Sequence, residues 1–260
     1  MRYGLPKKSK INGINKVIAV ASAKGGVGKS TISTNLAVAM SLSGRKVGLL
    51  DADIFGPSIP KMFNLFEKPY LSEKKHFVPL TNYGVKIMSM GLLINKDSPI
   101  VWRGLMVMKA LQQLIHDVDW GTLDLLVIDM PPGTGDTQLT ITQQIILDGV
   151  VIVSTPQDIA LMDAIRGINM FRKMDIKILG VVENMSVFVC PNCNYNTHIF
   201  GIDGLKRTAK NMNIEVLANI PLHEDIVQDC EKGYPTVIAD PSSSQSLSFK
   251  TLANIIWEKL

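Results

Sequence analysis

The sequence predicts an α/β domain with a layered, mostly parallel sheet and helices on both faces. Short runs of Val, Ile and Leu alternate with helical patterns along nearly the whole chain. Most of these runs are continuous, which is typical of strands buried on both faces of a parallel sheet. The alternation of strands and helices implies right-handed crossovers and a layered architecture. A glycine-rich segment, residues 24–31, lies between the first apolar run and the first helical pattern and is the third observation.

The predicted elements follow from these patterns in chain order. The predicted strands are residues 16–22, 46–51, 85–90, 123–129, 150–155, 178–183 and 215–220. The predicted helices are residues 30–43, 105–116, 159–174, 204–212 and 245–259. Two long connections interrupt the alternation. Residues 56–86 carry four prolines and residues 186–201 carry two cysteines, so we expect both to be irregular, as functional or mobile connections often are.

The composition indicates a folded domain. The 260 residues are enough for one large core, and 46% hydrophobic with 19% charged residues excludes a disordered chain. The net charge of +4 does not suggest a nucleic-acid-binding surface. We assign residues 1–15 to a basic N-terminal tail. Residues 16–260 form a single predicted domain that includes the cysteine-bearing insertion 186–201.

Membrane insertion and secretion are not expected. No apolar stretch is long enough to span a bilayer, and no secretory signal is present. An Arg/Ser-rich presequence is absent or has been removed. The last predicted helix has an apolar face but few basic residues beside it, which favours packing in the core over binding to a membrane. Three cysteines do not make a disulfide framework, so we expect reduced thiols in a matrix-like or cytosol-like compartment.

The glycine-rich segment has the pattern of a P-loop, Lys24-Gly25-Gly26-Val27-Gly28-Lys29-Ser30-Thr31. Glycines let successive backbone N–H groups surround a polyphosphate, and the following helix adds its positive end. We therefore expect residues 24–31 to bind ATP, with Lys29 on the β/γ-phosphates and Ser30 on Mg²⁺. Ala23 replaces the usual first glycine, but the glycines nearest the phosphates remain. The second lysine, Lys24, resembles the mark of deviant P-loop ATPases, in which it reaches the nucleotide of a partner subunit.

Carboxylates end two of the predicted strands. Asp51 and Asp53 follow one strand and are expected to face Mg²⁺ and the γ-phosphate, because ligands gather at the carboxyl ends of parallel strands. One carboxylate can hold a metal-bound water while the other positions the attacking water. Asp129 ends another apolar strand in a Walker B pattern and is expected to bind Mg²⁺ through water. Residues 130–136, with two prolines and two glycines, are typical of a switch loop that senses the γ-phosphate.

Two further residues are candidates for holding the base. Asn184 ends a later strand, and its amide can both donate to and accept from an adenine edge. Pro221 follows the next strand and could pack on the ring.

The pair Cys190 and Cys193 has several possible roles. An intrachain zinc site would need two more ligands, which His198 with Cys230 or His223 could supply. A thioredoxin-like redox pair would need its own small domain. If two copies of the chain meet at a two-fold axis, two C-x-x-C pairs make a four-thiolate site, which suits a [4Fe–4S] cluster or Zn²⁺.

The motifs together resemble the Mrp/ApbC family of iron–sulfur P-loop ATPases, relatives of MinD and of the nitrogenase iron protein. The matching segments are residues 23–31, 51–58, 129–136, 154–158 and 184–193. Residues 4–7, 101–106 and 197–201 are most similar to the mitochondrial nucleotide-binding-protein-like branch of that family.

The resemblance implies a fold, site roles and a function. It implies a deviant P-loop fold and a homodimer that bridges a labile [4Fe–4S] cluster through Cys190 and Cys193. It places Lys24, Lys29 and Asp53 in a slow ATPase reaction, with Asp53 orienting the hydrolytic water. It puts Asp51 and Asp129 near Mg²⁺ and Asn184 on adenine. The implied recipients are apo iron–sulfur proteins, including respiratory complex I subunits, in the mitochondrial matrix or else the cytoplasm.

Two other function classes remain open. A positioning ATPase of the MinD/ParA type, acting on membrane or DNA, would share the P-loop and could carry a structural zinc at the cysteine pair. A metabolic P-loop ligase or kinase would need its own acid–base groups. The four histidines, His76, His116, His198 and His223, are scattered along the chain and indicate no such group.

Overall fold

A nine-stranded sheet forms the centre of the molecule in the computed structural model, which describes residues 8–54, 56–93, 104–193 and 195–260. The strands are β1 Ile14–Ala21, β2 Val47–Asp51, β3 Leu80–Asn82, β4 Val85–Ser89, β5 Leu123–Asp129, β6 Gly149–Ser154, β7 Ile178–Val189, β8 Asn196–Thr197 and β9 Val216–Leu222. Their order is β3-β4-β2-β5-β1-β6-β7-β8, and β9 also pairs with β7. All pairs are parallel except β3 with β4 and β7 with β8.

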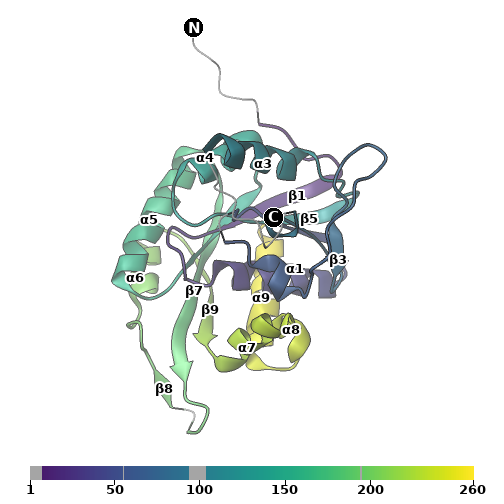
Figure 1. Cartoon of the computed structure of the whole chain (residues 1–260). Coiled ribbons are helices and arrows are strands. Elements are labelled where there is room, and N and C mark those ends of the chain that lie inside the picture. Colours follow the sequence, from purple (N-terminus) through teal and green to yellow (C-terminus); the bar gives the residue numbers. More distant parts are fainter. Residues whose placement is uncertain (1–7, 55, 94–103, 194) are drawn as a thin grey trace.

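Helices cover both faces of this sheet (Figure 1). They are α1 Lys29–Leu42, α2 Ile59–Met62, α3 Gly104–His116, α4 Asp136–Gln144, α5 Asp158–Lys173, α6 Gly204–Asn211, α7 Glu224–Lys232, α8 Thr236–Ala239 and α9 Ser244–Glu258, with a 3₁₀ turn at Met90–Leu92. Helices α3 to α6 contribute to one buried hydrophobic cluster, whereas α1, α2 and α7 to α9 contribute to the other.

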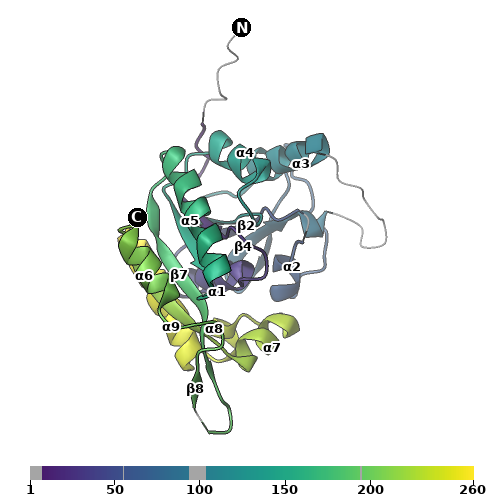
Figure 2. The same ribbon diagram turned by 90° about the vertical axis from the view of Figure 1, so that its left-hand side faces the viewer.

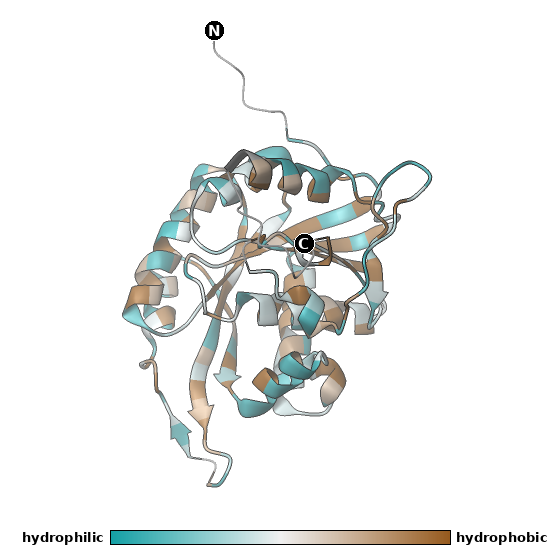
Figure 3. Cartoon of the chain, in the orientation of Figure 1, coloured by the Kyte–Doolittle hydropathy of each residue, from teal (hydrophilic) through white to brown (hydrophobic). Residues whose placement is uncertain are grey.

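The central strands have buried side chains on both faces. In β1, Val17 and Ala19 belong to the first cluster, and Ile18 and Val20 belong to the second. Figure 3 shows the central strands coloured mainly as hydrophobic. This burial on both faces explains why the strands appear in the sequence as continuous apolar runs. The predicted α/β fold with helices on both faces is confirmed.

The predicted elements are present within two residues at each end, with one exception. The strand predicted at 178–183 continues to Val189 as β7, and residues 196 and 197 form β8, so the expectation that residues 186–201 are irregular is wrong for these two parts of the segment. Phe188 pairs with Thr197 and Val189 with Asn196, which makes β7 and β8 a hairpin. Figures 1 and 2 both show this hairpin extending beyond the body of the molecule. The cysteine-bearing insertion is therefore a projecting hairpin.

The connection 56–86 is also more ordered than predicted. It contains α2 and β3, and β3 pairs antiparallel with β4. Helices α4, α7 and α8 were not predicted either. Residues 4–7 and 101–103 of the family resemblance, and Phe55 within segment 51–58, lie outside the described residues.

Helix α9 packs into the core, as the sequence predicted. Phe249, Leu252 and Ile256 are fully buried in the second cluster. Within the described part of the chain, every helix lacks either the length or the hydropathy needed to cross a bilayer.

Candidate functional site

The glycine-rich loop joins the carboxyl end of β1 to the start of α1. Gly26 and Gly28 have φ angles of 79° and 82°, a left-handed conformation that favours glycine. A Cβ atom at Gly28 would lie 2.1 Å from Nδ2 of Asn184, so no other residue fits there without displacing Asn184. That same Nδ2 atom donates a hydrogen bond of 2.8 Å to the carbonyl oxygen of Val27. The middle of β7 is thereby fixed to the loop.

Two buried carboxylates lie beside the loop. Asp51 and Asp129 are opposite each other in the register of β2 and β5, and both are fully buried. Nζ of Lys29 lies 2.8 Å from Oδ1 of Asp129 in an ion pair that is almost completely buried. Ser30 and Ser33 each donate a hydrogen bond of 2.6 Å to Asp129, through Oγ. The predicted residues Lys29, Ser30, Asp51 and Asp129 therefore form one cluster.

Asp51 has a strongly perturbed pKa. Its Oδ2 atom accepts a hydrogen bond of 2.9 Å from Ser89, and its Oδ1 atom accepts one of 3.1 Å from the backbone N–H of Asp53. Burial raises the pKa of Asp51 to about 8, and the neighbouring Asp129 adds to the shift. Two carboxylates near one lysine and one serine hydroxyl make a donor set that fits a hard divalent cation such as Mg²⁺.

The raised pKa of Asp51 predicts a pH-dependent stability for the nucleotide-free protein. Between the ordinary value of 3.8 and about 8, the folded state holds a proton that the unfolded state has released. Stability therefore falls as pH rises through this window, by up to about 1.4 kcal/mol per pH unit, and levels off above it. Asp51→Asn should remove this dependence. The free energy of unfolding of the variant, relative to that of wild type, should therefore increase from pH 5 to pH 8. Urea unfolding at several pH values measures this.

Asp53→Asn provides the matched control for Asp51→Asn. Asp53 is only partly buried, and the bond that it gives to Asp51 comes from its backbone, which the substitution retains. Parallel stability profiles for wild type and Asp51→Asn would contradict the assignment of the shifted proton to Asp51.

A cavity of about 150 Å³ lies next to the loop and contains both predicted base-binding residues. Gly28 and Thr31 line it together with Asn184 and Pro221. Cys230 also lines this cavity, although the sequence gave no reason to place it there. Nδ2 of Asn184 uses one of its two N–H groups on Val27, so its other N–H and its Oδ1 atom are left without a hydrogen-bond partner among the described residues at this cavity.

The remaining P-loop residues differ in exposure. Lys24, Gly25 and Gly26 are exposed on the loop, and Val27 is buried beneath it. Oδ1 of Asp53 accepts a hydrogen bond of 3.3 Å from the backbone N–H of Gly56.

Cys190 and Cys193 lie where the β7–β8 hairpin turns. Cys193 is exposed and Cys190 is half-buried. The backbone N–H groups of Asn192 and Cys193 lower the pKa of the Cys190 thiol, and the Cys193 side chain adds to this effect. A lowered pKa favours the thiolate, which is the form that binds metals.

An intrachain zinc site is not formed. Among the described residues, no group of three or more His, Cys, Asp or Glu side chains could hold a metal ion. Nδ1 of His198 lies 3.3 Å from the carbonyl oxygen of Ser186, and Nδ1 of His223 accepts a hydrogen bond from the N–H of Asp225 at the start of α7. Cys230 is buried on α7, where burial raises its pKa to about 11. The sequence-based alternative of a four-ligand site within one chain is therefore wrong.

Two supporting serines were missed by the sequence analysis. Ser33 bonds Asp129, and Ser89 bonds Asp51. Ser33 lies one helical turn after Ser30 and so shares its face of α1, which is a signal that the sequence did contain. Ser89 is opposite Asp51 in the register of β2 and β4, and that register is not visible in the sequence.

A glycine loop between β1 and α1, a buried lysine–aspartate pair and a serine hydroxyl on the same aspartate define a P-loop nucleoside triphosphatase. Comparison with known families makes this more specific. Residues 13–257 match the model of the ParA: NUBPL iron-transfer P-loop NTPase family. The chain belongs to this family.

Relatives and solved structures agree with this membership. The chain is 52% identical to the iron-sulfur cluster transfer protein NUBPL of Mus musculus, over 100% of this chain and 82% of that protein. It is 52% identical to the mitochondrial iron-sulfur protein required for NADH dehydrogenase of Arabidopsis thaliana, over 96% of this chain and 80% of that one. A nucleotide-binding protein from Archaeoglobus fulgidus, solved with ADP, superposes with a TM-score of 0.76 at 39% identity, covering 86% of this chain and 88% of that chain.

Proposed function

We propose that this protein is an ATP-binding iron–sulfur cluster carrier that works as a homodimer and delivers a labile [4Fe–4S] cluster to apoproteins. The observation that carries the proposal is the position of Cys190 and Cys193. They lie on a projecting hairpin, and no third metal ligand within the described residues accompanies them. A cubane cluster takes four thiolates, so two copies of the chain would complete the set.

The relatives support this proposal and suggest the recipients. Proteins about half identical to this chain are named as iron–sulfur cluster transfer or carrier proteins. The Arabidopsis relative is named as required for NADH dehydrogenase. We infer that the recipients include subunits of respiratory complex I and that the protein works in the mitochondrial matrix.

Nucleotide binding would be divided among the residues of the site. Lys29 would contact the phosphates, and Ser30, Asp51 and Asp129 would hold Mg²⁺ directly or through water. When bound, Mg²⁺ would neutralise charge on the β- and γ-phosphates. Asp53 would position the attacking water, while Lys24 would reach the nucleotide of the second copy. Slow hydrolysis would then serve to change the state of the dimer.

An exposed apolar surface lies next to the hairpin and favours contact with a second copy. Ile159 and Met162 on α5 are 66% and 59% exposed, and Ile199 and Ile202 after the hairpin are 54% and 61% exposed. A Cβ built on Gly201 would lie 3.7 Å from the carbonyl oxygen of Pro156, so the two segments adjoin. Neighbouring exposed apolar side chains often mark an interaction site.

The test is anaerobic reconstitution of the wild-type chain with iron and sulfide. We expect about four iron and four sulfide per two chains, with a sedimentation coefficient of a dimer. ATP and ADP should change either the dimerisation constant or the rate of cluster transfer to an apo-acceptor. A strictly monomeric, iron-loaded protein would overturn the proposal, as would zinc as the only metal retained after anaerobic loading.

A further inference from the structure

The switch loop, residues 130–136, leaves the carboxyl end of β5 as a stiff segment. Met130 and Pro131 are buried, whereas Pro132 is exposed. The two prolines have nearly fixed φ angles, and each proline also restricts the residue before it. Neither proline has a backbone N–H, so Gly133 carries the first N–H of the loop after that of Met130. The placement of Pro131 therefore limits where the Gly133 N–H can lie.

A buried hydrogen bond from α4 holds Pro131. Nε2 of Gln138 donates a bond of 2.6 Å to the carbonyl oxygen of Pro131. Gln138 lies in the first turn of α4 and is only 1% exposed, and Ile141 anchors the same helix in the core. Oε1 of Gln138 has no hydrogen-bond partner within the described residues, so the bond to Pro131 is the one that fixes this amide. Breaking it would leave a buried carbonyl oxygen without a donor, which costs free energy.

A second hydrogen bond joins the switch loop to the start of the glycine-rich loop. The backbone N–H of Gly133 donates a bond of 3.0 Å to the carbonyl oxygen of Ser22. Oγ of Ser22 in turn donates a bond of 3.0 Å to the carbonyl oxygen of Lys24. Thr134 and Gly135, which follow Gly133, are exposed. The N–H groups of residues 133–135 are therefore candidates for contact with the outermost phosphate of a nucleotide on the glycine-rich loop.

We propose that Gln138 is a positioning residue for recognition of the γ-phosphate. By holding the carbonyl of Pro131, it sets the N–H groups of residues 133–135 where they distinguish ATP from ADP. This role depends on the proposed function, since the switch loop can sense a γ-phosphate only if the site binds ATP. Methionine at position 138 has a similar length but donates no hydrogen bond, so it would release the switch loop and leave Lys29 and Asp129 in place.

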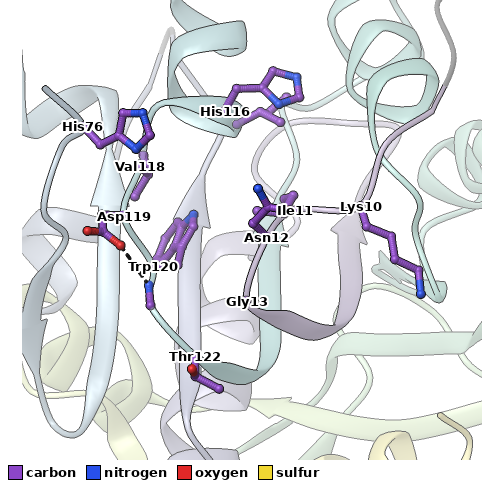
Figure 4. A pocket seen from close by; sticks show the side chains of 12 residues that line it. Lys10, Ile11, Asn12, Gly13, His76, His116, Val118, Asp119, Trp120 and Thr122 are labelled. Atoms are coloured by element: carbon purple, nitrogen blue, oxygen red, sulfur yellow. Dashed lines mark hydrogen bonds between the residues drawn. The ribbon is translucent and has the colours of Figure 1, made fainter. Parts of the chain in front are cut away.

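Gln144, in the last turn of α4, provides the matched control. Its backbone carbonyl accepts a bond of 2.9 Å from the N–H of Ser9, and its side-chain oxygen is buried without a partner in the described part of the chain. Ser9 precedes residues 10–13, which line a pocket of about 340 Å³ at the amino-terminal edge of the sheet (Figure 4). Gln144→Met is therefore the same chemical change on the same helix, at the edge of the sheet opposite to the switch loop.

The test is calorimetric titration of the full chain, with Mg²⁺ present, using ADP and the non-hydrolysable ATP analogue adenylyl imidodiphosphate. We expect wild type and Gln144→Met to bind the analogue about tenfold more tightly than ADP, the scale of one hydrogen bond to a charged oxygen. Gln138→Met should bind ADP as wild type does, while its preference for the analogue should fall below about twofold. A merely structural role would weaken the binding of both nucleotides alike and leave the preference unchanged.

Gln138→Asn decides the matter if Gln138→Met does not fold. It keeps the amide but is one methylene shorter, so it should not reach Pro131 and should show the same loss of preference. An unchanged preference in the folded Gln138 variants would overturn the proposal. An equal loss in Gln144→Met, or equal affinity of wild type for the two nucleotides, would also overturn it. Wild type that bound neither nucleotide would instead contradict the proposed nucleotide site, and the positioning role with it.

Discussion

Replacing both Cys190 and Cys193 with serine is expected to remove about nine tenths or more of the bound iron and sulfide. Each copy offers one pair of thiols at the hairpin, so the double substitution removes every proposed cluster ligand from the dimer. A serine hydroxyl stays protonated at neutral pH and cannot replace the thiolate that Cys190 readily provides. Anaerobic reconstitution followed by iron, sulfide and visible-absorbance analysis measures the loss.

Cys230→Ala is the matched control for this experiment. Cys230 is buried on α7 at the nucleotide cavity, and burial raises its thiol pKa to about 11. The control should therefore hold as much cluster as wild type, whatever its effect on nucleotide binding. A Cys190→Ser/Cys193→Ser protein that retained wild-type amounts of cluster would refute the assignment of these thiols.

Replacing Lys29 with methionine is expected to have two large effects. The ammonium group is buried against Asp129, so its removal leaves an uncompensated buried carboxylate and should lower the free energy of unfolding by about 3 kcal/mol. ATP affinity should fall on the order of a hundredfold, because a charge-assisted contact to the phosphates is lost. Urea unfolding without nucleotide and calorimetric titration with MgATP measure the two effects separately.

The neighbouring lysine offers a direct comparison. Lys24 lies on the same loop but is exposed, so Lys24→Met should change the free energy of unfolding by less than about 0.5 kcal/mol. If Lys29→Met and Lys24→Met had equal free energies of unfolding, the buried ion pair between Lys29 and Asp129 would not stabilise the fold.

The sheet and most of the nucleotide site could be predicted because their physical cause is local in the sequence. Strands buried on both faces must be continuously apolar, and a polyphosphate-binding turn must be rich in glycine. The contact between Gly28 and Asn184 could not be predicted, because these residues are 156 positions apart in the sequence and meet only in the folded structure. The bond from Ser89 to Asp51 likewise depends on which strands are neighbours, and strand order is a property of the whole fold.

Two of the features that the sequence analysis missed show how tertiary contacts override weak local signals. The extension of β7 is stabilised by pairing with a strand of only two residues, whose sequence, Asn196–Thr197, looks like loop. Helix α4 contains three Thr residues, which are weak helix formers. It is held by buried Ile141 and by a hydrogen bond of 2.6 Å from Nε2 of Gln138 to the carbonyl oxygen of Pro131.

The bond between Asn184 and Val27 has a mechanical consequence for a carrier of this kind. Asn184 lies on β7, six positions before Cys190, a separation of at most about 20 Å in extended chain. One backbone segment, with a bulge after Asn184 where Met185 has a φ angle of 55°, therefore runs from the wall of the nucleotide cavity to the sulfur atoms. If a phosphate group displaces the loop, the displacement would reach the cysteines along this segment, and cargo release would need no relay through a separate domain.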